Sequence, residues 1–315
     1  SKRLQGIRTI DSKMGTRAML LQTPNFILSF GKPASENQGT VMMGQLAWSG
    51  NFKMDYEIDS YKNLRLIAGI NPFASEYSLQ PNQVFKTPAL LYALSNNGTG
   101  EASRNLHDWA RKYRLLDGQG ERLTLLNNWE ATYFDFDTDK IKKIVDSAAD
   151  LGIELFVLDD GWFGKRDDDT SGLGDWFENT EKLKGGLKGI ADYVHQKNMT
   201  FGLWFEPEMV NADSDLFRQH PDYALQTPDR SMSTSRDQYV LDFSRKEVRE
   251  TITAQMRAIL DTIDIDYIKW DMNRPLTEVN SALLPPEKKG ETFHRYILGL
   301  YDILEWLKTS YPDLL

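Results

Sequence analysis

The sequence Lys-Trp-Asp-Met-Asn-Arg at residues 269–274 follows an apolar run at 263–268, which predicts a buried strand that ends in charged and polar side chains. Side chains at positions i and i+2 share one face of a strand. We therefore expect Lys269, Asp271 and Asn273 on the same face. A cation beside a carboxylate favours its ionised form, which suits a nucleophile or a base. The alternative is an ordinary ion pair at a strand end.

The residues after position 120 repeat a rhythm of strand, loop and helix. Strands are predicted at 123–129, 154–158, 200–205, 239–243 and 266–270, each followed by a helical pattern. One helix, at 139–151, stops at Gly152, and Ser-Arg-Lys-Glu at 244–247 predicts a capping box for another. Such β/α units indicate a parallel sheet, either doubly wound or a (β/α)8 barrel. The lack of a glycine-rich phosphate-binding motif after any strand disfavours the nucleotide-binding form.

Acidic and aromatic residues gather where the predicted strands end. In a barrel the carboxyl ends of all strands converge on one mouth, where the active site is built. The pattern therefore predicts a pocket lined by carboxylates and indole rings, although an acidic residue in such a place can also cap a helix. The residues concerned are Trp129, Glu130, Asp159, Asp160, Trp162, Trp204, Glu206, Glu208, Asp242, Asp271 and Asn273.

The first hundred residues follow a different pattern. Short and partly alternating apolar segments at 18–30, 41–47, 52–58, 64–70 and 84–94 are separated by turn signals, which predicts antiparallel β structure. A helical pattern at 103–116 and the sequence Asp-Gly-Gln-Gly at 117–120 predict a connecting helix and then a boundary. The predicted organisation is a β domain at 1–100, a helical linker at 101–120 and a β/α domain at 121–315.

The composition is that of a globular protein with an acidic balance. The 315 residues are 40% hydrophobic, with a mean hydropathy of −0.51. The net charge of −9 disfavours a nucleic-acid partner, because neutralising phosphates takes a basic surface. No apolar span is long enough for a transmembrane helix, so no membrane partner is expected. The absence of cysteine excludes disulfides and thiolate catalysis and fits a reducing, cytoplasmic compartment.

Two chemistries fit a mouth of carboxylates without cysteine. A retaining glycosidase uses one ionised carboxylate to attack the anomeric carbon and a second, protonated carboxyl group to assist the leaving group. Asp271 is the candidate nucleophile. Trp129 and Trp204 at the same mouth favour a sugar, because the C–H face of a hexose ring packs on an indole.

The alternative chemistry is a metal-assisted enolisation. Carboxylates from successive strands would bind Mg²⁺, and a lysine would act as the base. The candidate ligands are Asp160, Glu206 and Asp242, and the candidate base is Lys269. Loss of activity with a chelator would favour this alternative.

Five ordered motifs resemble those of the bacterial α-galactosidases of glycoside hydrolase family 36. They are Asn-Trp-Glu-Ala at 128–131, Leu-Asp-Asp-Gly-Trp-Phe-Gly at 158–164, Gly-Asp-Trp at 174–176, Leu-Trp-Phe-Glu-Pro-Glu-Met-Val at 203–210 and Tyr-Ile-Lys-Trp-Asp-Met-Asn-Arg at 267–274. The resemblance implies an α/β fold, namely a (β/α)8 TIM-barrel catalytic domain, incomplete in this chain, preceded by part of an antiparallel β-supersandwich. It also implies a retaining α-galactosidase that hydrolyses terminal α-D-galactosyl residues of melibiose and raffinose-type oligosaccharides through a covalent galactosyl-Asp intermediate, with no cofactor and no metal.

The same resemblance assigns roles around the nucleophile. Asp271 matches the family nucleophile. Lys269 would bind sugar hydroxyls and help to keep Asp271 ionised, and Asn273 would contact the region of the 2-hydroxyl. The acid/base Asp of the family lies in a glycine-rich segment that has no match before Leu315, so it is expected beyond that residue.

The resemblance further assigns residues to the sugar itself. Asp159 and Asp160 would grip the 4- and 6-hydroxyls, and Trp129 and Trp204 would be ring platforms. Arg236 would be a hydrogen-bond donor, with a salt bridge inside its loop as the alternative. Other residues have plainer expected roles. Glu206 would be a support behind the site, Trp162 and Trp176 would belong to the packing or to the rim of the site, and the charged run at 165–169 would be a solvated loop.

The missing acid/base segment indicates that the chain is an internal piece of a longer enzyme, inactive or crippled when alone. A noncatalytic galactose-binding role is therefore a second alternative. The resemblance also implies a homo-oligomer, specifically a tetramer, for the full-length protein.

Overall fold

The computed structural model describes residues 3–15, 22–278 and 280–315, which pack as two compact units. The N-terminal unit comprises Ser1–Glu121 together with Pro275–Thr277. The C-terminal unit comprises Arg122–Arg274 and Glu278–Leu315. The three-part domain division predicted from the sequence stays a prediction.

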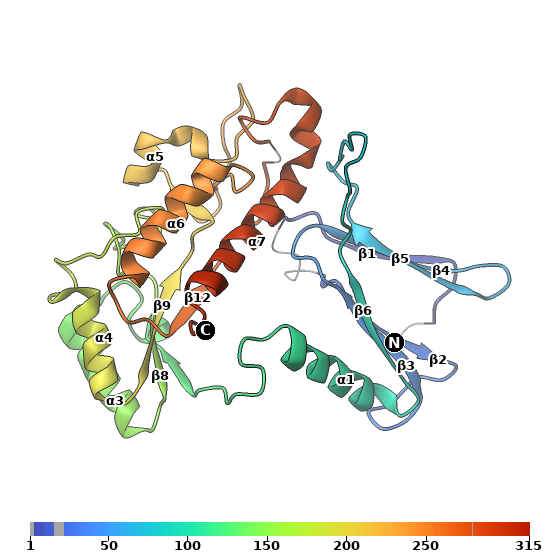
Figure 1. Ribbon diagram of the computed structural model, residues 1–315, viewed down its shortest axis with the longest axis horizontal. Helices are drawn as coiled ribbons and strands as arrows, with labels where there is room; N and C mark the ends of the chain where they lie inside the picture. Colours follow the sequence, from blue (N-terminus) through green and yellow to red (C-terminus); the bar gives the residue numbers. More distant parts are fainter. Residues whose placement is uncertain (1–2, 16–21, 279) are drawn as a thin grey trace. The chain divides into compact units, whose positions relative to one another are not determined.

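The N-terminal unit holds two antiparallel sheets of three strands each (Figure 1). Alternate residues of the strands are buried, as in Phe52, Met54 and Tyr56, because successive side chains point to opposite faces. The first sheet has the order β1 (Ile7–Asp11), β4 (Phe52–Ile58), β5 (Leu64–Ile70), and the second has the order β2 (Asn25–Phe30), β3 (Thr40–Leu46), β6 (Leu90–Ser95). Helix α1 (Gly98–Tyr113) packs against β6 and β3.

The predicted strands of this unit are confirmed in part. β4 and β5 have the predicted bounds, whereas β1 was not predicted because it is short and mostly exposed. The segment predicted at 84–94 is a strand only from Leu90, and residues 18–21 of the segment predicted at 18–30 lie outside the described part of the chain.

The C-terminal unit is built on a parallel sheet with the strand order β12-β9-β8-β7. Its central strands are continuously apolar, since a parallel strand is covered on both faces. The strands are β7 (Leu125–Asn127), β8 (Leu155–Leu158), β9 (Thr200–Phe205) and β12 (Tyr267–Trp270). Helices α3 and α4 pack together, as do α6 and α7 (Figure 1). The helices are α2 (Trp129–Thr132), α3 (Thr138–Asp150), α4 (Gly186–Gln196), α5 (Asp215–Gln219), α6 (Lys246–Leu260) and α7 (Thr292–Ser310), with 3₁₀ turns η2 (Pro221–Tyr223) and η3 (Pro286–Glu291).

Local sequence explains the limits of helix α3. Asp137 caps its first turn by accepting a hydrogen bond from the Lys140 backbone N–H. Ile141, Val145 and Ala148 lie on one face at helical spacing and are fully buried. The predicted helix at 139–151 is thus confirmed within one residue at each end.

The fourth predicted strand of the parallel sheet is wrong. β11 (Gln238–Val240) pairs antiparallel with β10 (Met209–Asn211), while β9 pairs directly with β12, placing Gly202 opposite Tyr267. The apolar pattern at 239–243 reports burial but does not specify the partner strand. Asp242 consequently does not end a strand of the parallel sheet.

The predicted capping box at 244–247 is also wrong. Helix α6 begins at Lys246 with Arg245 as its N-cap residue, and no side chain caps it. The Ser244 hydroxyl instead donates to Asp242 Oδ1 at 2.5 Å. The Ser244 hydroxyl is therefore bonded to the buried Asp242 carboxylate and does not make the hydrogen bond that a capping box requires.

The last residue of the chain extends the parallel sheet. The Leu315 N–H donates to the Asp266 carbonyl at 3.0 Å, and the Leu315 carbonyl accepts from the Ile268 N–H at 2.8 Å. This is the hydrogen-bond pattern of a parallel neighbour. Leu315 therefore lies along the side of β12 that does not face β9.

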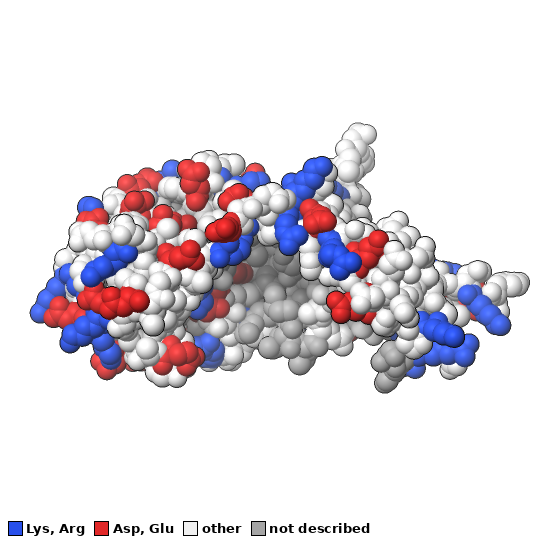
Figure 2. All heavy atoms as spheres, turned by 90° about the horizontal axis from the view of Figure 1, so that it is seen from below, with Lys and Arg blue, Asp and Glu red and all other residues white. Residues whose placement is uncertain are grey.

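The surface carries charges of both signs. Figure 2 shows Lys and Arg side chains interspersed with Asp and Glu side chains on the face that it presents. Some form pairs along helices, such as Lys188 with Asp192 at 2.8 Å. Within the described ranges, the helices are all too short or too polar to span a lipid bilayer.

Candidate active site

Asp271 lies directly after β12, at the carboxyl end of the parallel sheet, and is half-buried. Its backbone N–H donates to the Phe205 carbonyl of β9 at 2.8 Å, which fixes the residue to the neighbouring strand. Its Oδ2 accepts hydrogen bonds from Trp204 Nε1 at 3.2 Å and Asn273 Nδ2 at 2.8 Å, and its Oδ1 accepts from the Met272 N–H at 2.9 Å. Three donors therefore hold this carboxylate in one orientation.

Lys269 pairs with Asp159 and not with Asp271, so the predicted ion-pair partner was wrong. The Lys269 Nζ lies 2.7 Å from Asp159 Oδ2, and the Asp159 side chain is 3% exposed. Asp159 also accepts a hydrogen bond from Asn127 Nδ2, which comes from the end of β7. A buried carboxylate gains more from a cation than a partly solvated one, which explains the choice of partner. The pair still places Lys269 and Asp159 together at the same sheet edge as Asp271.

Asp160 is held by Arg166, a residue that sequence analysis missed. Both side chains are buried; Arg166 Nε donates to Asp160 Oδ1 at 3.0 Å and Nη2 donates to Oδ2 at 2.8 Å. Burial raises the pKa of Asp160, and the Arg166 guanidinium acts in the opposite direction. The run at 165–169 is therefore not simply a solvated loop: Arg166 is 1% exposed. The sequence signal that could have pointed to Arg166 was the acidic pair Asp159 and Asp160, because a buried acidic pair requires a nearby cation.

Glu206 lies behind Asp271. Its Oε1 accepts from the Asn273 N–H at 2.5 Å, and its Oε2 accepts from Gln238 Nε2 at 3.2 Å. Burial raises the pKa of Glu206 to about 7, and the nearby Asp271 charge also raises it, while hydrogen bonds from Asn273 lower it. The arrangement agrees with the expected supporting position of Glu206 and brings Asn273 to Asp271.

Glu208, three residues beyond the end of β9, is buried within the unit. Its Oε1 accepts from Trp270 Nε1 at 3.0 Å and its Oε2 from the Tyr296 hydroxyl at 2.6 Å. Burial raises the pKa of Glu208. Because Trp270 and Asp271 are consecutive, Glu208 anchors the end of β12 to helix α7.

The two predicted ring platforms differ in exposure. Trp204 is 1% exposed and stacks on Phe163, with ring centroids 6.1 Å apart. This packing does not support the predicted role of Trp204 as an open platform for a sugar ring. Its contact with the site is the hydrogen bond that its Nε1–H donates to Asp271. Trp129 is half-buried in α2 with Phe134 edge-on to its ring, so its platform role stays a prediction. Trp162 is fully buried, as expected for packing.

Arg236 is exposed in a tight turn. Its φ is +55°, in the left-handed region. Gln238, two residues later, donates to Glu206 and thereby ties the turn to the residues behind Asp271. The structure thus brings the Arg236 turn to the same end of the sheet.

The carboxylates proposed as metal ligands do not form one site. Asp160 is paired with Arg166, Glu206 accepts from Asn273 and Gln238, and Asp242 accepts from Ser244 and Ser281. Among the residues that the structure describes, no three His, Cys, Asp or Glu side chains are grouped to hold a metal ion. The enolisation alternative therefore lacks its expected ligand set.

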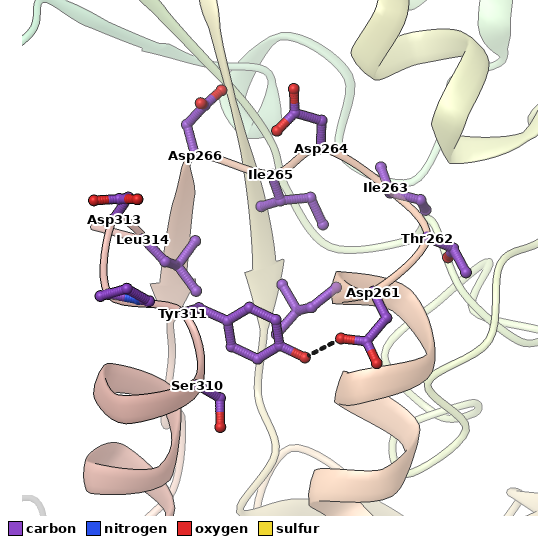
Figure 3. Close-up of a pocket in the computed structure, with 12 residues that line it drawn as sticks. Asp261, Thr262, Ile263, Asp264, Ile265, Asp266, Ser310, Tyr311, Asp313 and Leu314 are labelled. Carbon is purple, nitrogen blue, oxygen red and sulfur yellow. Dashed lines mark hydrogen bonds between the residues drawn. The ribbon is translucent and has the colours of Figure 1, made fainter.

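A separate pocket of about 490 Å³ lies at the opposite end of β12 (Figure 3). It is lined by residues 260–266 and 310–314. The Tyr311 hydroxyl donates to Asp261 Oδ1 at 2.6 Å across it, and burial together with that carboxylate raises the pKa of Tyr311 to about 12. The pocket faces the amino end of the strand, so it is not the predicted mouth.

Comparison with known proteins assigns this arrangement to a family. The sequence model of the Melibiase family matches residues 84–315, and that of the glycosyl hydrolase family 36 N-terminal domain matches residues 2–80. The chain belongs to glycosyl hydrolase family 36. The resemblance inferred from the five motifs is therefore confirmed, and so is the α/β class of fold, a TIM barrel that follows a β domain.

Relatives in family 36 are α-galactosidases by name. Alpha-galactosidase Mel36A of Lactobacillus acidophilus is 46% identical over 314 residues, which are 99% of this chain and 42% of Mel36A. Two solved structures are variants of the α-galactosidase AgaA of Geobacillus stearothermophilus, one in complex with raffinose and one with 1-deoxygalactonojirimycin. Each matches with a TM-score of 0.95 at 43% identity and covers 99% of this chain and 44% of that chain. The chain thus spans less than half the length of these relatives.

Proposed function

We propose that the protein carrying this family 36 chain is a retaining α-galactosidase that hydrolyses terminal α-D-galactosyl residues of melibiose and raffinose-type oligosaccharides. The observation that carries this proposal is the Asp271 carboxylate, oriented by Trp204 and Asn273 at the carboxyl end of a parallel sheet. The names of the relatives and the raffinose complex of AgaA support the substrate class.

In the proposed reaction Asp271 attacks the anomeric carbon from the face opposite the leaving group. In the first step a covalent galactosyl ester forms on Asp271 while a general acid protonates the leaving oxygen. In the second step the same residue, now acting as a base, activates a water molecule that cleaves the ester. We assign the acid role to neither Glu206 nor Glu208, because protein donors already enclose both carboxyl groups.

The remaining predicted contacts surround the sugar in this proposal. Asp159 and Asp160 would accept from the 4- and 6-hydroxyls through lone pairs that Lys269 and Arg166 leave free. Asn273 already donates to Asp271, so a contact with the 2-hydroxyl would use its second N–H. The other proposed sugar contacts are Trp129 and Arg236.

The experiment replaces Asp271 in the whole protein that carries this chain. Asp271→Gly should lower turnover of an aryl α-galactoside by about 10⁴-fold or more, because no nucleophile remains. Added azide should restore part of the rate and yield β-galactosyl azide. A fluorinated galactosyl inhibitor that traps the intermediate should label the peptide holding Asp271, and a label on any other peptide would overturn the assignment.

The proposal extends to assembly and location. A homotetramer rests on the family resemblance alone, and light scattering of the whole protein would test it. A cytoplasmic location rests on the absence of cysteine in the chain. Fractionation of the source cells would test that location.

A further inference from the structure

The turn that carries Arg236 has an unfavourable backbone. Arg236 and Asp237 both have φ of +55°, in the left-handed region that residues with a side chain seldom adopt. The Gln238 N–H closes this two-residue turn by donating to the Ser235 carbonyl at 3.2 Å. Gly, Asn and Asp are the usual residues in such a turn, so a long side chain at its first position needs further support, and backbones of this kind recur at ligand clamps and active sites. The contacts that impose it are therefore of functional interest.

Two buried side chains donate hydrogen bonds to the backbone carbonyls of the turn and of the residues that flank it. Asn211, fully buried at the end of β10, donates from Nδ2 to the Asp237 carbonyl at 2.8 Å. Arg274, 1% exposed, donates from Nη1 to the carbonyls of Ser233 at 3.0 Å and Gln238 at 2.5 Å. The backbone on each side of Arg236 is thus fixed, while the Arg236 side chain stays exposed.

The Asn211 side chain also contacts Arg166, the residue that holds Asp160. Its Oδ1 accepts from Arg166 Nη1 at 3.2 Å and from the Leu173 N–H at 2.8 Å. Its Nδ2 donates a second hydrogen bond, to the Asp169 carbonyl at 3.2 Å. Both donors and both acceptor positions of the amide are in use, so neither aspartate nor leucine could replace it without leaving buried polar groups unpaired.

We propose that Asn211 is a positioning residue that fixes two sugar-binding groups at once. It holds the left-handed turn so that Arg236 is presented to the substrate, and it supports the Arg166 guanidinium that orients Asp160. The inference rests on the proposed α-galactosidase function, because it assumes that Arg236 and Asp160 meet the same galactose. The backbone of the turn and the Asp160 carboxylate are thus held in place before the sugar binds, which lowers the entropic cost of ordering them on binding.

The test compares variants of the whole protein that carries this chain. The readouts are the affinity for 1-deoxygalactonojirimycin by calorimetry and the separate values of KM and kcat on an aryl α-galactoside. Asn211→Ala should weaken binding of the probe by about 10-fold or more and raise KM by a larger factor than it lowers kcat. Adding Arg236→Ala to Asn211→Ala should cause less further loss than Arg236→Ala causes alone, because both act through one turn.

A second variant covers the case in which Asn211→Ala does not fold. Asp237→Gly removes the left-handed strain, so its Tm should not fall, but the freed turn should weaken binding of the probe severalfold. The matched control is Asn71→Ala, which removes an equally buried amide from the N-terminal unit. This control should lower Tm without changing the affinity for the probe.

The outcomes separate the inference from the function on which it rests. If the unaltered protein neither binds the probe nor hydrolyses any α-galactoside, the proposed function fails and the inference fails with it. If the unaltered protein does both, the inference is overturned by folded Asn211→Ala or Asp237→Gly protein with unchanged affinity. Fully independent losses from Asn211→Ala and Arg236→Ala would also overturn it.

Discussion

At the scale of single residues, the proposed nucleophile Asp271 lies beside a carboxyl group in a different environment. Asp271 is half-buried among three donors, whereas Glu206 is 1% exposed with its pKa raised to about 7. Neighbouring acids whose environments separate their ionisation can take different roles. Burial thus moves the ionisation of Glu206 to near neutral pH, beside Asp271.

The Asp271 charge should be measurable at Glu206. Since that negative charge raises the pKa of Glu206, Asp271→Asn should lower the pKa of Glu206 from its value of about 7. Titration of ¹³C-labelled glutamate carboxyl groups by NMR would show the change. Glu208, whose raised pKa comes from burial, serves as the control and should not move. An unchanged or higher pKa for Glu206 would contradict the expected coupling.

The pair of Lys269 and Asp159 provides a second prediction at this scale. Lys269→Met leaves the Asp159 carboxylate, 3% exposed, without its cation. Because the lysine side chain is itself 38% exposed, we expect a loss of only about 1 to 2 kcal/mol in the free energy of unfolding. Denaturant unfolding would measure it, and adding Asp159→Asn should recover part of the loss.

The control for this pair is Lys188→Met, which breaks an exposed pair with Asp192 on helix α4. Exposed pairs contribute little, so that variant should change the free energy of unfolding by less than about 0.5 kcal/mol. Equal losses in the two variants would show that burial of Asp159 has no special effect.

At the scale of elements, sequence patterns located the strands better than their partners. The apolar runs at 154–158, 200–205 and 266–270 became β8, β9 and β12 within one residue at each end. The run at 239–243 did not join them, because periodicity reports which face is buried and not which strand lies beside it. The same limit applies to the site. The alternation of side chains along one strand predicted Lys269 beside Asp271, whereas the ion-pair partner of Lys269 is Asp159, which comes from another part of the sheet.

Helix α7 and strand β12 are joined by a buried acid, which makes their contact depend on pH. Burial raises the folded-state pKa of Glu208 above 4.5, so the stabilising neutral form is lost as pH rises through that folded-state value. Glu208→Gln cannot ionise and keeps hydrogen-bonding groups for Trp270 and Tyr296. The variant should therefore gain stability relative to the unaltered protein as pH rises from about 5 to about 8.

Thermal unfolding at several pH values would test this expectation. Glu305→Gln, which replaces an exposed glutamate of the same helix, should show no such trend. If the Tm difference between Glu208→Gln and the unaltered protein stays constant over that range, the carboxyl group does not ionise with the proposed effect.

At the scale of the whole molecule, a short segment from the second half of the sequence belongs to the N-terminal unit. Pro275–Thr277 packs there, and the Leu276 N–H donates to the Met14 carbonyl at 3.2 Å. Leu276 is 3% exposed, so its side chain completes the packing of that unit. Sequence patterns could not indicate this, because three residues carry no periodicity and their neighbours are more than two hundred positions away.

Leu276→Ala should therefore weaken the N-terminal unit. Loss of a buried leucine typically lowers the free energy of unfolding by about 2 to 5 kcal/mol. Hydrogen exchange would resolve the effect: amides of β4 (Phe52–Ile58) should exchange faster, while those of β8 (Leu155–Leu158) should change little, because local units open separately. Leu283→Ala removes a leucine that is 62% exposed and should leave both strands protected. Equal loss of protection in β4 and β8 would show that the two units unfold as one, and the assignment of this segment to the N-terminal core alone would then be wrong.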